Sequence, residues 1–495
     1  MSEMRYLKIN PLDNVAVALT DLECGFAAEV DGKSIVLQED IGRGHKFAIC
    51  DIAENSNIIK YGAPIGHATC AIKCGVWVHT RNIKTNLSGR EEYVYTPELP
   101  ADREERPVPT FNGFRRPNGD VGIRNELWII PTVGCVNKTA ELLARRFSVT
   151  KEGVTGAYAF THPYGCSQMG DDHATTRAIL ANLVHHPNAA GVLVVALGCE
   201  NNTLDDFKVE IGEIDSNKVR YMVVQQESDE IAKGLELLAE LEEYAGSFKR
   251  EAIPVSELRV GLKCGGSDGL SGITANPLVG SFSDKIISYG GTSVLTEVPE
   301  MFGAETLLMA RCADKKIFDD CVEMVNGFKD YFISHNQVVY ENPSPGNKAG
   351  GISTLEEKSL GCTQKGGASK VVDVLTYTDR LEKKGLNLMA GPGNDMVAVT
   401  ALTAAGAHII LFTTGRGTPL GAPAPTVKIA TNSALASFKN NWIDFNAGVL
   451  VEGTSMADAT NDLMQKIIDI ANGEETRGEA SGYREIAIFK DGVTL

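Results

Sequence analysis

The segment NELWIIPTVGCVNKTAELLARRF (residues 125–147) joins an apolar run to a helix-like stretch through a short turn. The run Leu127–Ile130 is typical of a buried strand, and Thr139–Phe147 has apolar residues at helical spacing. The turn between them holds Pro131, Gly134 and Cys135. A strand, a tight turn and a helix in this order predict one β/α unit of a parallel sheet.

The same unit recurs along most of the chain in two series. In the first series the apolar runs are Ala157–Phe160, Val192–Leu197 and Tyr221–Val224, and the helix-like stretches are Asp172–Val184 and Ser228–Tyr244. The second series follows Arg250–Pro254, with runs at Val260–Lys263, Thr292–Leu295, Leu386–Met389 and His408–Phe412. We therefore expect two Rossmann-like α/β lobes with mainly parallel sheets, at residues 115–250 and 251–495.

The first ninety residues have a different pattern. They contain short alternating runs broken by Gly, Asn and Asp turns, at Val15–Ala18, Ser34–Leu37, His45–Asp51, Asn57–Tyr61 and Ala63–Thr69. This pattern predicts a small all-β module at residues 1–95. Residues 96–109 hold four prolines among charged residues, so we assign 96–114 to an interdomain linker. The fold class is α/β, with an N-terminal β module followed by the two lobes.

Composition limits the classes of partner. The net charge is −17 and no block of basic residues interrupts it, which argues against a nucleic acid or an anionic membrane surface. The N-terminus lacks a signal-peptide pattern, and no apolar stretch approaches the ~18 residues of a membrane span, so we expect a cytoplasmic protein. The eleven cysteines include no CxxC pair, which favours reduced thiols over disulfides or a structural zinc site.

Four cysteines share one position relative to the predicted strands. Cys135, Cys166, Cys199 and Cys264 each follow the end of an apolar run. Ligands bind at the carboxyl edge of parallel sheets, so these four thiols are expected to line one crevice. Cysteine is also a small residue that fits tight turns, so a purely structural role stays open for each of the four cysteines taken alone.

The segment THPYGCSQMGDDH (161–173) concentrates metal-ligand residue types between a strand and a helix. Histidine, thiol and carboxylate groups together suit Fe(II) or Mn(II). Glu200 directly follows Cys199, and three roles stay open for it: a metal ligand, a proton carrier or a solvated residue. His79 lies on a predicted strand of the β module. The candidate metal ligands are His79, Cys166, His173, Cys199, Glu200 and Cys264.

Three further segments favour an anionic or polyhydroxylated ligand. The glycine-rich turn CGGSDGLSGITANP (264–277) lacks both the P-loop ending and a GxGxxG motif, so its Ser267, Asp268 and Asn276 are expected to bind hydroxyl groups. Residues 296–305 place Glu297 and Glu300 after a strand, as general base or metal ligand. The polar segment 341–367 shows no hydrophobic periodicity and is expected to be a binding loop or disordered. Its Lys358, with Arg416, supplies cations for a carboxylate.

Several long motifs, in order, resemble the altronate/galactarate dehydratase family and its altronate branch. They are RRPNGDVGIRNELWIIPTVGC (115–135), THPYGCSQMGDDH (161–173), CGGSDGLSGITANP (264–277), TEVPEMFGAE (296–305), ENPSPGNKAGGISTLEEKSLGCTQK (341–365) and FTTGRGTP (412–419). The first ninety residues resemble the SAF-type β-clip module of that family, and residues 484–495 resemble its tail. The resemblance implies dehydration of D-altronate to 2-dehydro-3-deoxy-D-gluconate in hexuronate catabolism, with Fe(II) or Mn(II) as cofactor.

The chemistry implied by this resemblance assigns roles to the candidates. His162 is the first candidate for the base that removes the C2 proton and Glu297 the second, while Arg416 and Lys358 hold the carboxylate. One motif departs from the family. Its His-x-His-Asn reads His79-Thr-Arg81-Asn82 here, so a metal role does not carry over to position 81.

Other functions stay open at this stage. Within dehydratases, the substrate could be galactarate or another sugar acid, and an aconitase-like [4Fe–4S] cluster could use Cys135, Cys166, Cys199 and Cys264. A nicotinamide oxidoreductase lacks support because no GxGxxG motif is present. Outside enzymes, the alternative is a non-catalytic sugar-acid-binding protein. The expected partner is a small sugar acid, and we expect a homodimer.

Overall fold

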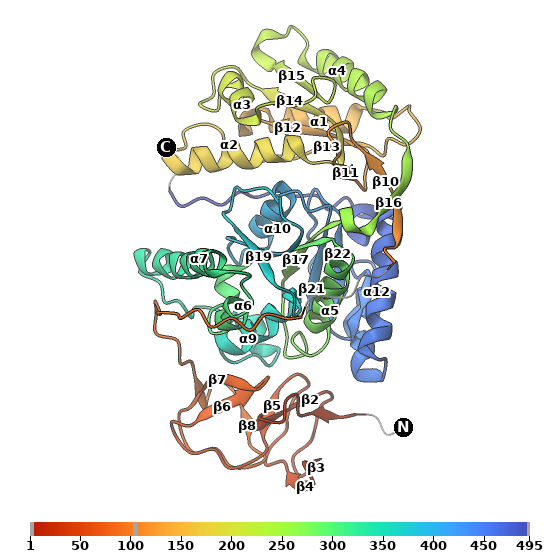
Figure 1. The fold of residues 1–495 in the computed structure, drawn as a ribbon. Helices are drawn as coiled ribbons and strands as arrows, with labels where there is room; N and C mark the ends of the chain where they lie inside the picture. The colour runs from red at the N-terminus through yellow and green to blue at the C-terminus, as the bar shows by residue number, and fades with distance from the viewer. Residues whose placement is uncertain (1–3, 102–106, 493–495) are drawn as a thin grey trace.

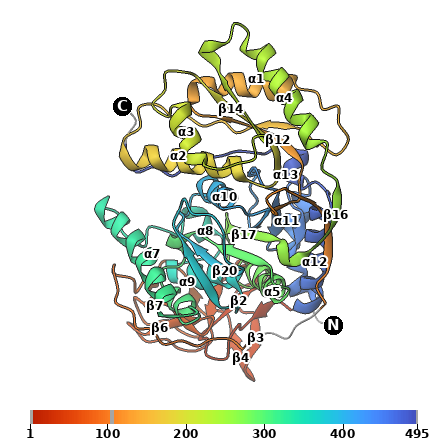
Figure 2. The same ribbon diagram turned by 45° about the horizontal axis from the view of Figure 1, so that its top comes forward.

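The computed structural model describes residues 4–101 and 107–492. Residues 102–106 of the predicted linker and 493–495 of the tail lie outside this range. The two views show the N-terminal β module and the first lobe at opposite ends, with the second lobe between them (Figures 1 and 2). Within the described ranges no helix has both the length and the apolar character needed to cross a membrane.

The N-terminal module is built from short β-strands, as predicted. Its strands are β1 (Tyr6–Leu7), β2 (Val15–Ala18), β3 (Ala27–Val30), β4 (Lys33–Val36), β5 (Lys46–Ala48), β6 (Asn57–Lys60), β7 (Ala63–Ala68), β8 (Trp77–Val78) and β9 (Ile83–Lys84). They form the antiparallel sheets β1-β2-β5-β8, β3-β4 and β6-β7-β9. In β3 Ala28 and Val30 are buried and Glu29 is exposed, which is the alternation of a half-buried strand.

A small antiparallel sheet connects the two lobes. It has the order β11-β10-β16, from β10 (Thr110–Arg115), β11 (Val121–Gly122) and β16 (Arg250–Pro254). The pairing of β10 with β16 runs from Thr110 opposite Pro254 to Phe114 opposite Arg250. The chain therefore enters and leaves the first lobe side by side.

The first lobe is a parallel four-stranded sheet between helices. Its strands are β12 (Glu126–Pro131), β13 (Ala157–Ala159), β14 (Ala189–Ala196) and β15 (Val219–Val223), in the order β13-β12-β14-β15. Its helices are α1 (Asn137–Arg146), α2 (Gly170–His185), α3 (Leu204–Ile211) and α4 (Glu230–Ala245), with the 3-10 turns η1 (Gly134–Val136) and η2 (Val224–Gln226). All eight residues of β14 are buried, which explains its uninterrupted apolar run.

The second lobe contains a seven-stranded parallel sheet with the order β19-β20-β18-β17-β21-β22-β23. Its strands are β17 (Arg259–Cys264), β18 (Thr292–Leu295), β19 (Val371–Leu375), β20 (Gly385–Met389), β21 (Ile409–Thr414), β22 (Thr426–Ala430) and β23 (Phe445–Asn446). The strand order reverses beside β17, and ligands bind at such a switch point. The segments that follow β17, β18 and β21 therefore meet at one edge.

Helices cover both faces of this sheet (Figure 2). They are α5 (Ala275–Ser288), α6 (Glu305–Met309), α7 (Lys315–Ser334), α8 (Pro345–Ala349), α9 (Leu355–Cys362), α10 (Asp395–Ala404), α11 (Ser433–Phe438), α12 (Met456–Ala471) and α13 (Arg477–Ala480). The 3-10 turns are η3 (Val255–Glu257), η4 (Val298–Glu300), η5 (Thr363–Gly366) and η6 (Ala447–Glu452). The fold class expected from the sequence, a β module and two lobes with parallel sheets, is confirmed.

The polar segment 341–367 is neither an open loop nor disordered. It contains α8, α9 and η5, and every residue of α9 is buried. A helix that is buried all round shows no apolar stripe, and here its inward side chains include Glu356, Glu357 and Lys358. Ion pairs satisfy Glu357 and Lys358, and Thr85 Oγ1 and the Asn86 N–H donate to Glu356. The absence of periodicity therefore did not indicate irregular structure.

The β module docks on the carboxyl edge of the second lobe and not on the first lobe. Lys46 and Lys60 of the module both pair with Glu357 of α9, at 2.7 and 2.8 Å, and all three side chains are buried. After β9 the chain continues along the second lobe, where Tyr95 Oη donates to Cys312 O at 3.0 Å. The domain boundaries expected from the sequence, at 95, 114 and 250, stay a prediction.

Candidate active site

Two thiols and a carboxylate converge at the carboxyl edge of the second lobe. Cys264 ends β17, Glu300 ends η4 and Cys362 ends α9. The two Sγ atoms lie 3.4 Å apart, and each thiol donates to Oε2 of Glu300 at 3.2 Å. All three residues are buried. They form a compact set of potential metal ligands.

Three lysines surround these groups. Lys358 donates to Glu300 Oε1 at 2.7 Å and to Asn342 Oδ1 at 3.0 Å. Lys365 lies 3.0 Å from the Sγ of Cys264.

The third lysine, Lys263, sits between two carboxylates. It pairs with Glu297 and, at 2.7 Å, with Asp395. The three ammonium groups are thus matched by the carboxylates of Glu297, Glu300 and Asp395, so the cluster is formally neutral while both thiols keep their protons.

Burial and neighbouring charges move the pKa values of these groups in opposite directions. Burial favours the neutral form of Glu300, but Lys358, Lys263 and Lys365 outweigh it and lower the pKa to about 2. Burial, with the charge of Glu300 beside it, raises the pKa of Glu297. The hydrogen bond to Cys264, together with burial, raises the pKa of Cys362 well above its usual range.

Glu297 has a strained backbone. Its φ is 72° and its ψ 56°, in the left-handed region that residues with a Cβ rarely adopt. Its Oε2 accepts from the Cys264 backbone N–H at 2.9 Å. Strain of this kind persists where surrounding structure holds it in place, often at functional sites.

A small cavity adjoins the thiol pair. Its lining includes four of the predicted substrate-binding residues, Ser267, Asp268, Asn276 and Lys358, together with Cys362, Glu357 and two residues of the β module, Lys60 and Tyr61. Its volume is about 10 Å³, enough for about one water molecule. The β module therefore supplies part of the wall of this site.

Asp268 is the second carboxyl of this cavity, beside Glu357. Its Oδ1 accepts from Ser271 Oγ at 3.0 Å, and its Oδ2 from Thr431 Oγ1 at 3.0 Å. Burial raises its pKa, an effect that these hydrogen bonds only partly offset.

Arg416 and His79 do not line the cavity. Both lie near segment 341–351. Arg416 is exposed, and its Nη1 donates to Gly346 O at 3.1 Å. His79 is buried in the module with its ring 5.1 Å from that of His45, and His45 Nε2 is 3.3 Å from Ala349 O. Burial lowers the pKa of His79 to about 4.

The remaining predicted site residues belong to the first lobe, away from this cluster. His162 is buried with both ring nitrogens bonded, Nε2 to Pro131 O at 2.8 Å and Nδ1 to the Tyr164 N–H at 3.2 Å. Burial lowers its pKa to about 4. Its ring therefore braces the loop after β12 and does not face the cavity.

The other first-lobe candidates have separate surroundings. Glu200 accepts from Thr132 Oγ1 at 2.7 Å and from two backbone N–H groups of its own loop. His173 lies beside Arg177 on α2. Cys166 and Cys199 follow β13 and β14. The expected crevice of four cysteines is thus divided, because Cys264 contacts Cys362 in the other lobe.

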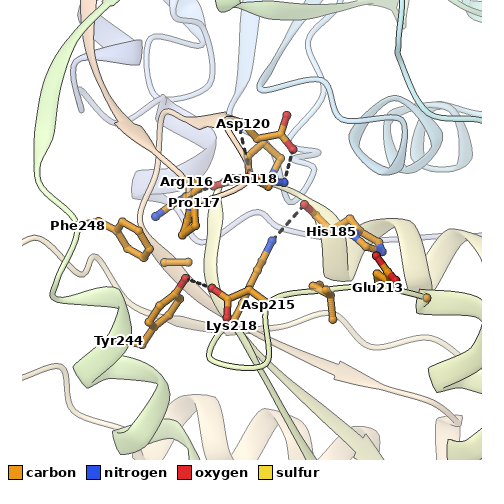
Figure 3. Close-up of a pocket in the computed structure, with 14 residues that line it drawn as sticks. Arg116, Pro117, Asn118, Asp120, His185, Glu213, Asp215, Lys218, Tyr244 and Phe248 are labelled. Atoms are coloured by element: carbon orange, nitrogen blue, oxygen red, sulfur yellow. Dashed lines mark hydrogen bonds between the residues drawn. The ribbon is translucent and has the colours of Figure 1, made fainter.

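A larger cavity, of about 580 Å³, lies in the first lobe (Figure 3). Its wall includes Pro187 and Lys218, which precede β14 and β15, so it opens at the amino ends of these strands. Lys218 donates to the carbonyl oxygens of His185 and His186 at 3.1 and 3.0 Å, and burial lowers its pKa to about 7. None of the predicted site residues lies here.

Sequence reasoning missed several residues of the cluster. Cys362 and Lys263 were not singled out, and neither were Lys60 and Tyr61 of the module. The sequence held one signal for Cys362. It directly follows a glycine within a long polar segment, and Cys135, Cys166 and Cys199 also directly follow glycines. The role of the module in the cavity wall had no signal in the sequence.

Comparison with known proteins accounts for nearly the whole chain. The family models for the altronate/galactarate dehydratase SAF domain, the D-galactarate dehydratase/altronate hydrolase second domain and the D-galactarate/altronate dehydratase C-terminal domain match residues 4–86, 113–246 and 255–494.

Characterised relatives match over their full length. Altronate dehydratase of Escherichia coli (strain K12) is 56% identical over 99% of this chain and 100% of its own, and altronate dehydratase of Bacillus subtilis (strain 168) is 53% identical over 99% of each. Galactarate dehydratase (L-threo-forming) of Escherichia coli is 33% identical over 98% of this chain and 96% of its own. With three matching models in sequence order and relatives aligned from end to end, the chain belongs to the altronate/galactarate dehydratase family.

Proposed function

We propose that this protein is an altronate dehydratase, a hydro-lyase that converts D-altronate to 2-dehydro-3-deoxy-D-gluconate and water. The observation that carries the proposal is the 56% and 53% identity to two altronate dehydratases over essentially the whole chain, against 33% to a galactarate dehydratase. Galactarate is the second candidate substrate, supported by the full length of that weaker match.

Iron fits the donor atoms of the cluster. The Sγ atoms of Cys264 and Cys362 and Oε2 of Glu300 lie 3.2 to 3.4 Å from one another, so one ion can contact all three. Thiolates favour iron over manganese, which prefers oxygen ligands. A divalent ion that replaces the two thiol protons also leaves the cluster neutral. We propose these three residues as the ligands of Fe(II), with Mn(II) as a weaker substitute.

When bound, the ion supplies a Lewis acid that polarises an oxygen of the substrate. The residues around the cavity supply the rest of the chemistry. Among the described residues, two carboxyls line the cavity. Glu357 is paired with Lys46 and Lys60, whereas Asp268 has a raised pKa, which suits a base that accepts the C2 proton. Glu297 is not among the residues that line this cavity, and it is bonded to Lys263 and to the Cys264 N–H, so it positions these groups.

Lys358 and Arg416 complete the proposed site. The Lys358 ammonium is held by Glu300 and Asn342 and lines the cavity, where it donates to the substrate carboxylate or to the departing hydroxyl. Arg416 binds the carboxylate from the rim. The cavity of about 10 Å³ holds about one water molecule, so a six-carbon acid needs a more open form of the site.

The test is a screen of aldonates and aldarates with anaerobically added Fe(II), reading out 2-keto-3-deoxy acid. We expect turnover of D-altronate, with kcat/KM at least about tenfold above that for galactarate, a difference of about 1.4 kcal/mol. Asp268→Asn should be inactive, and the control Asp51→Asn, an exposed module residue, should match the wild type. Faster turnover of galactarate would reassign the substrate, and binding without keto-acid release would identify a sugar-acid-binding protein.

The cellular setting belongs to the same proposal. A role in hexuronate catabolism, a cytoplasmic location and a homodimer are consistent with this function, and each has its own test. Growth of a deletion strain on hexuronates, fractionation and light scattering of the purified protein measure the three directly.

A further inference from the structure

We propose that the first lobe binds a [4Fe–4S] cluster through Cys135, Cys166 and Cys199, at a site separate from the Cys264–Cys362 pair. The proposal concerns thiols that the dehydratase site leaves unused. It is independent of the substrate, and it rests on the placement of three cysteines at the ends of three adjacent parallel strands.

The strand register brings these cysteines to equivalent positions. Pro131 of β12 is paired with Val195 of β14, and Cys135 and Cys199 each lie four residues further along their strands. Ile129 of β12 is paired with Ala159 of β13, and from this pair Cys135 is six residues onward and Cys166 seven. Because β12 lies between β13 and β14, the three thiol-bearing turns are neighbours at one edge of the sheet.

Hydrogen bonds join the three turns. The Gly134 N–H donates to Tyr164 O at 2.8 Å, which ties the Cys135 turn to the Cys166 turn. The Asn202 N–H donates to Gly165 O at 2.9 Å, and Asn201 Oδ1 lies 3.3 Å from the Sγ of Cys166. These bonds tie the Cys166 turn to the Cys199 turn and fix the three positions relative to one another.

Glycine at 165 makes this close approach possible. Gly165 has φ +98°, and a Cβ on it would lie 2.0 Å from Thr132 O in the turn after β12. A side chain there would force the turns of Cys135 and Cys166 apart. Each of the three cysteines follows a glycine directly, at 134, 165 and 198.

The three thiols are accessible to a ligand. Cys135 and Cys199 are exposed, and Cys166 is half-buried against the first-lobe core. Helix α1 begins two residues after Cys135 with no side-chain cap and no acidic residue in its first turn, and its N-terminal N–H groups stabilise anionic sulfur. Gln225 Nε2 already donates to the Sγ of Cys199 at 3.4 Å.

The spacing of the first-lobe thiols does not fit a single ion. Among the described residues, the set of three whose ligand atoms all lie within 4.8 Å of one another is Cys264, Glu300 and Cys362, so the first-lobe thiols are spread more widely. Sulfurs around one tetrahedral ion, at ~2.3 Å from it, are only ~3.8 Å apart. A cluster of four irons and four sulfides spans a wider triangle of thiolates. Three thiolates leave one iron without a cysteine ligand.

The test uses full-length protein purified without oxygen and reconstituted with equal amounts of ferrous and ferric iron plus sulfide. We expect brown protein with about four acid-labile sulfides per chain. The variants Cys135→Ser, Cys166→Ser and Cys199→Ser, and their combination, should lose the labile sulfide and the visible absorbance. Cys50→Ser and Cys70→Ser, exposed thiols of the β module, are the matched controls and should retain both.

A second pair of variants separates the two iron sites. Cys264→Ser with Cys362→Ser should keep the labile sulfide of the first lobe while losing the ion of the second lobe. The melting temperatures of all variants report folding, and exposed substitutions should leave them unchanged. Wild-type protein without labile sulfide after reconstitution, or sulfide retained by the folded triple variant as adventitious iron sulfide, would overturn the proposal.

Discussion

The thiols of Cys264 and Cys362, 98 positions apart in the sequence, lie 3.4 Å from each other in the protein interior. Both lie 3.2 Å from the same oxygen of Glu300 and are placed to donate to it. The pair is therefore a dithiol that is ready to exchange two protons for one divalent ion.

The first prediction concerns Cys362, which ends α9. Cys362→Ser removes a metal ligand itself. Loss of a residue that only supports a ligand lowers metal affinity ~10–100-fold, so this substitution should lower the affinity for Fe(II) by more than that. Dehydratase activity should fall with bound iron. Cys321→Ser, another buried thiol of the second lobe, is the control and should bind iron normally. Equal iron affinity in the two variants would exclude Cys362 as a ligand.

Iron binding should release about two protons per ion, because both thiols must ionise to become ligands. The apparent affinity should then rise about a hundredfold per pH unit below the thiol pKa values. Isothermal titration in buffers of different ionisation enthalpy counts the protons. The Cys362→Ser variant should release about one, and an iron affinity that does not change with pH would contradict thiolate ligation.

A third prediction concerns the docking of the β module through Glu357. Burial disfavours the charge on Glu357, but Lys46 and Lys60 outweigh it and hold its pKa far below its usual range. Glu357→Gln leaves two buried ammonium groups without their carboxylate, which should destabilise the protein by ~3–5 kcal/mol. Denaturant unfolding measures the loss.

The control for this prediction is the pair of Lys8 and Asp31 in the same module, at 2.6 Å, in which Asp31 is exposed. Asp31→Asn should cost less than about 1 kcal/mol, as surface ion pairs do. If both substitutions had the same small effect, the buried ion pairs would not hold the module in place.

Arg416→Lys should lower kcat/KM for D-altronate about ten- to hundredfold, since the planar fork that binds a carboxylate through two hydrogen bonds is lost, at ~1.5–3 kcal/mol. The melting temperature should stay unchanged, because Arg416 is exposed and its bond in the structure is to Gly346 O. Arg90→Lys, at an exposed pair with Asp330, is the control. Unchanged kcat/KM would remove Arg416 from the site, and a lowered melting temperature would assign it to loop bracing.

Acid should weaken the contact between the lobes at His186. Its Nε2 is 3.1 Å from Ala407 O of the second lobe and its Nδ1 accepts the Asn188 N–H, so only the neutral ring fits. Burial lowers the pKa of His186 to about 3. The unfolded chain takes up a proton near pH 6.5 and the folded chain does not, so stability should fall by about 4 kcal/mol between pH 6.5 and pH 3.

The pH dependence of unfolding checks this prediction. His186→Gln should lower stability at neutral pH and reduce the slope between pH 6.5 and pH 4, because one titrating group is gone. An unchanged slope would show that His186 is not among the groups responsible.

The sequence predicted the parallel lobes well because their strands are buried on both faces, as in β14, and read as plain apolar runs. The sequence-based prediction failed at α9, whose charged side chains are buried. Glu357 pairs with Lys60 of the β module, hundreds of residues away in the sequence, and Lys358 pairs with Glu300, dozens of residues away. Local patterns do not encode such partners. The same limit explains why Cys264 was expected beside first-lobe thiols and instead lies against Cys362.

The pairing of Lys46 with Glu357 spans 311 positions of the chain. During synthesis at ~5–20 residues per second, the module leaves the ribosome about 15–60 s before its docking surface exists. For that interval its docking face is in water, where the two ammonium groups that are later buried keep it hydrated. The charges that complete the native contact would thus also protect the nascent chain from premature association.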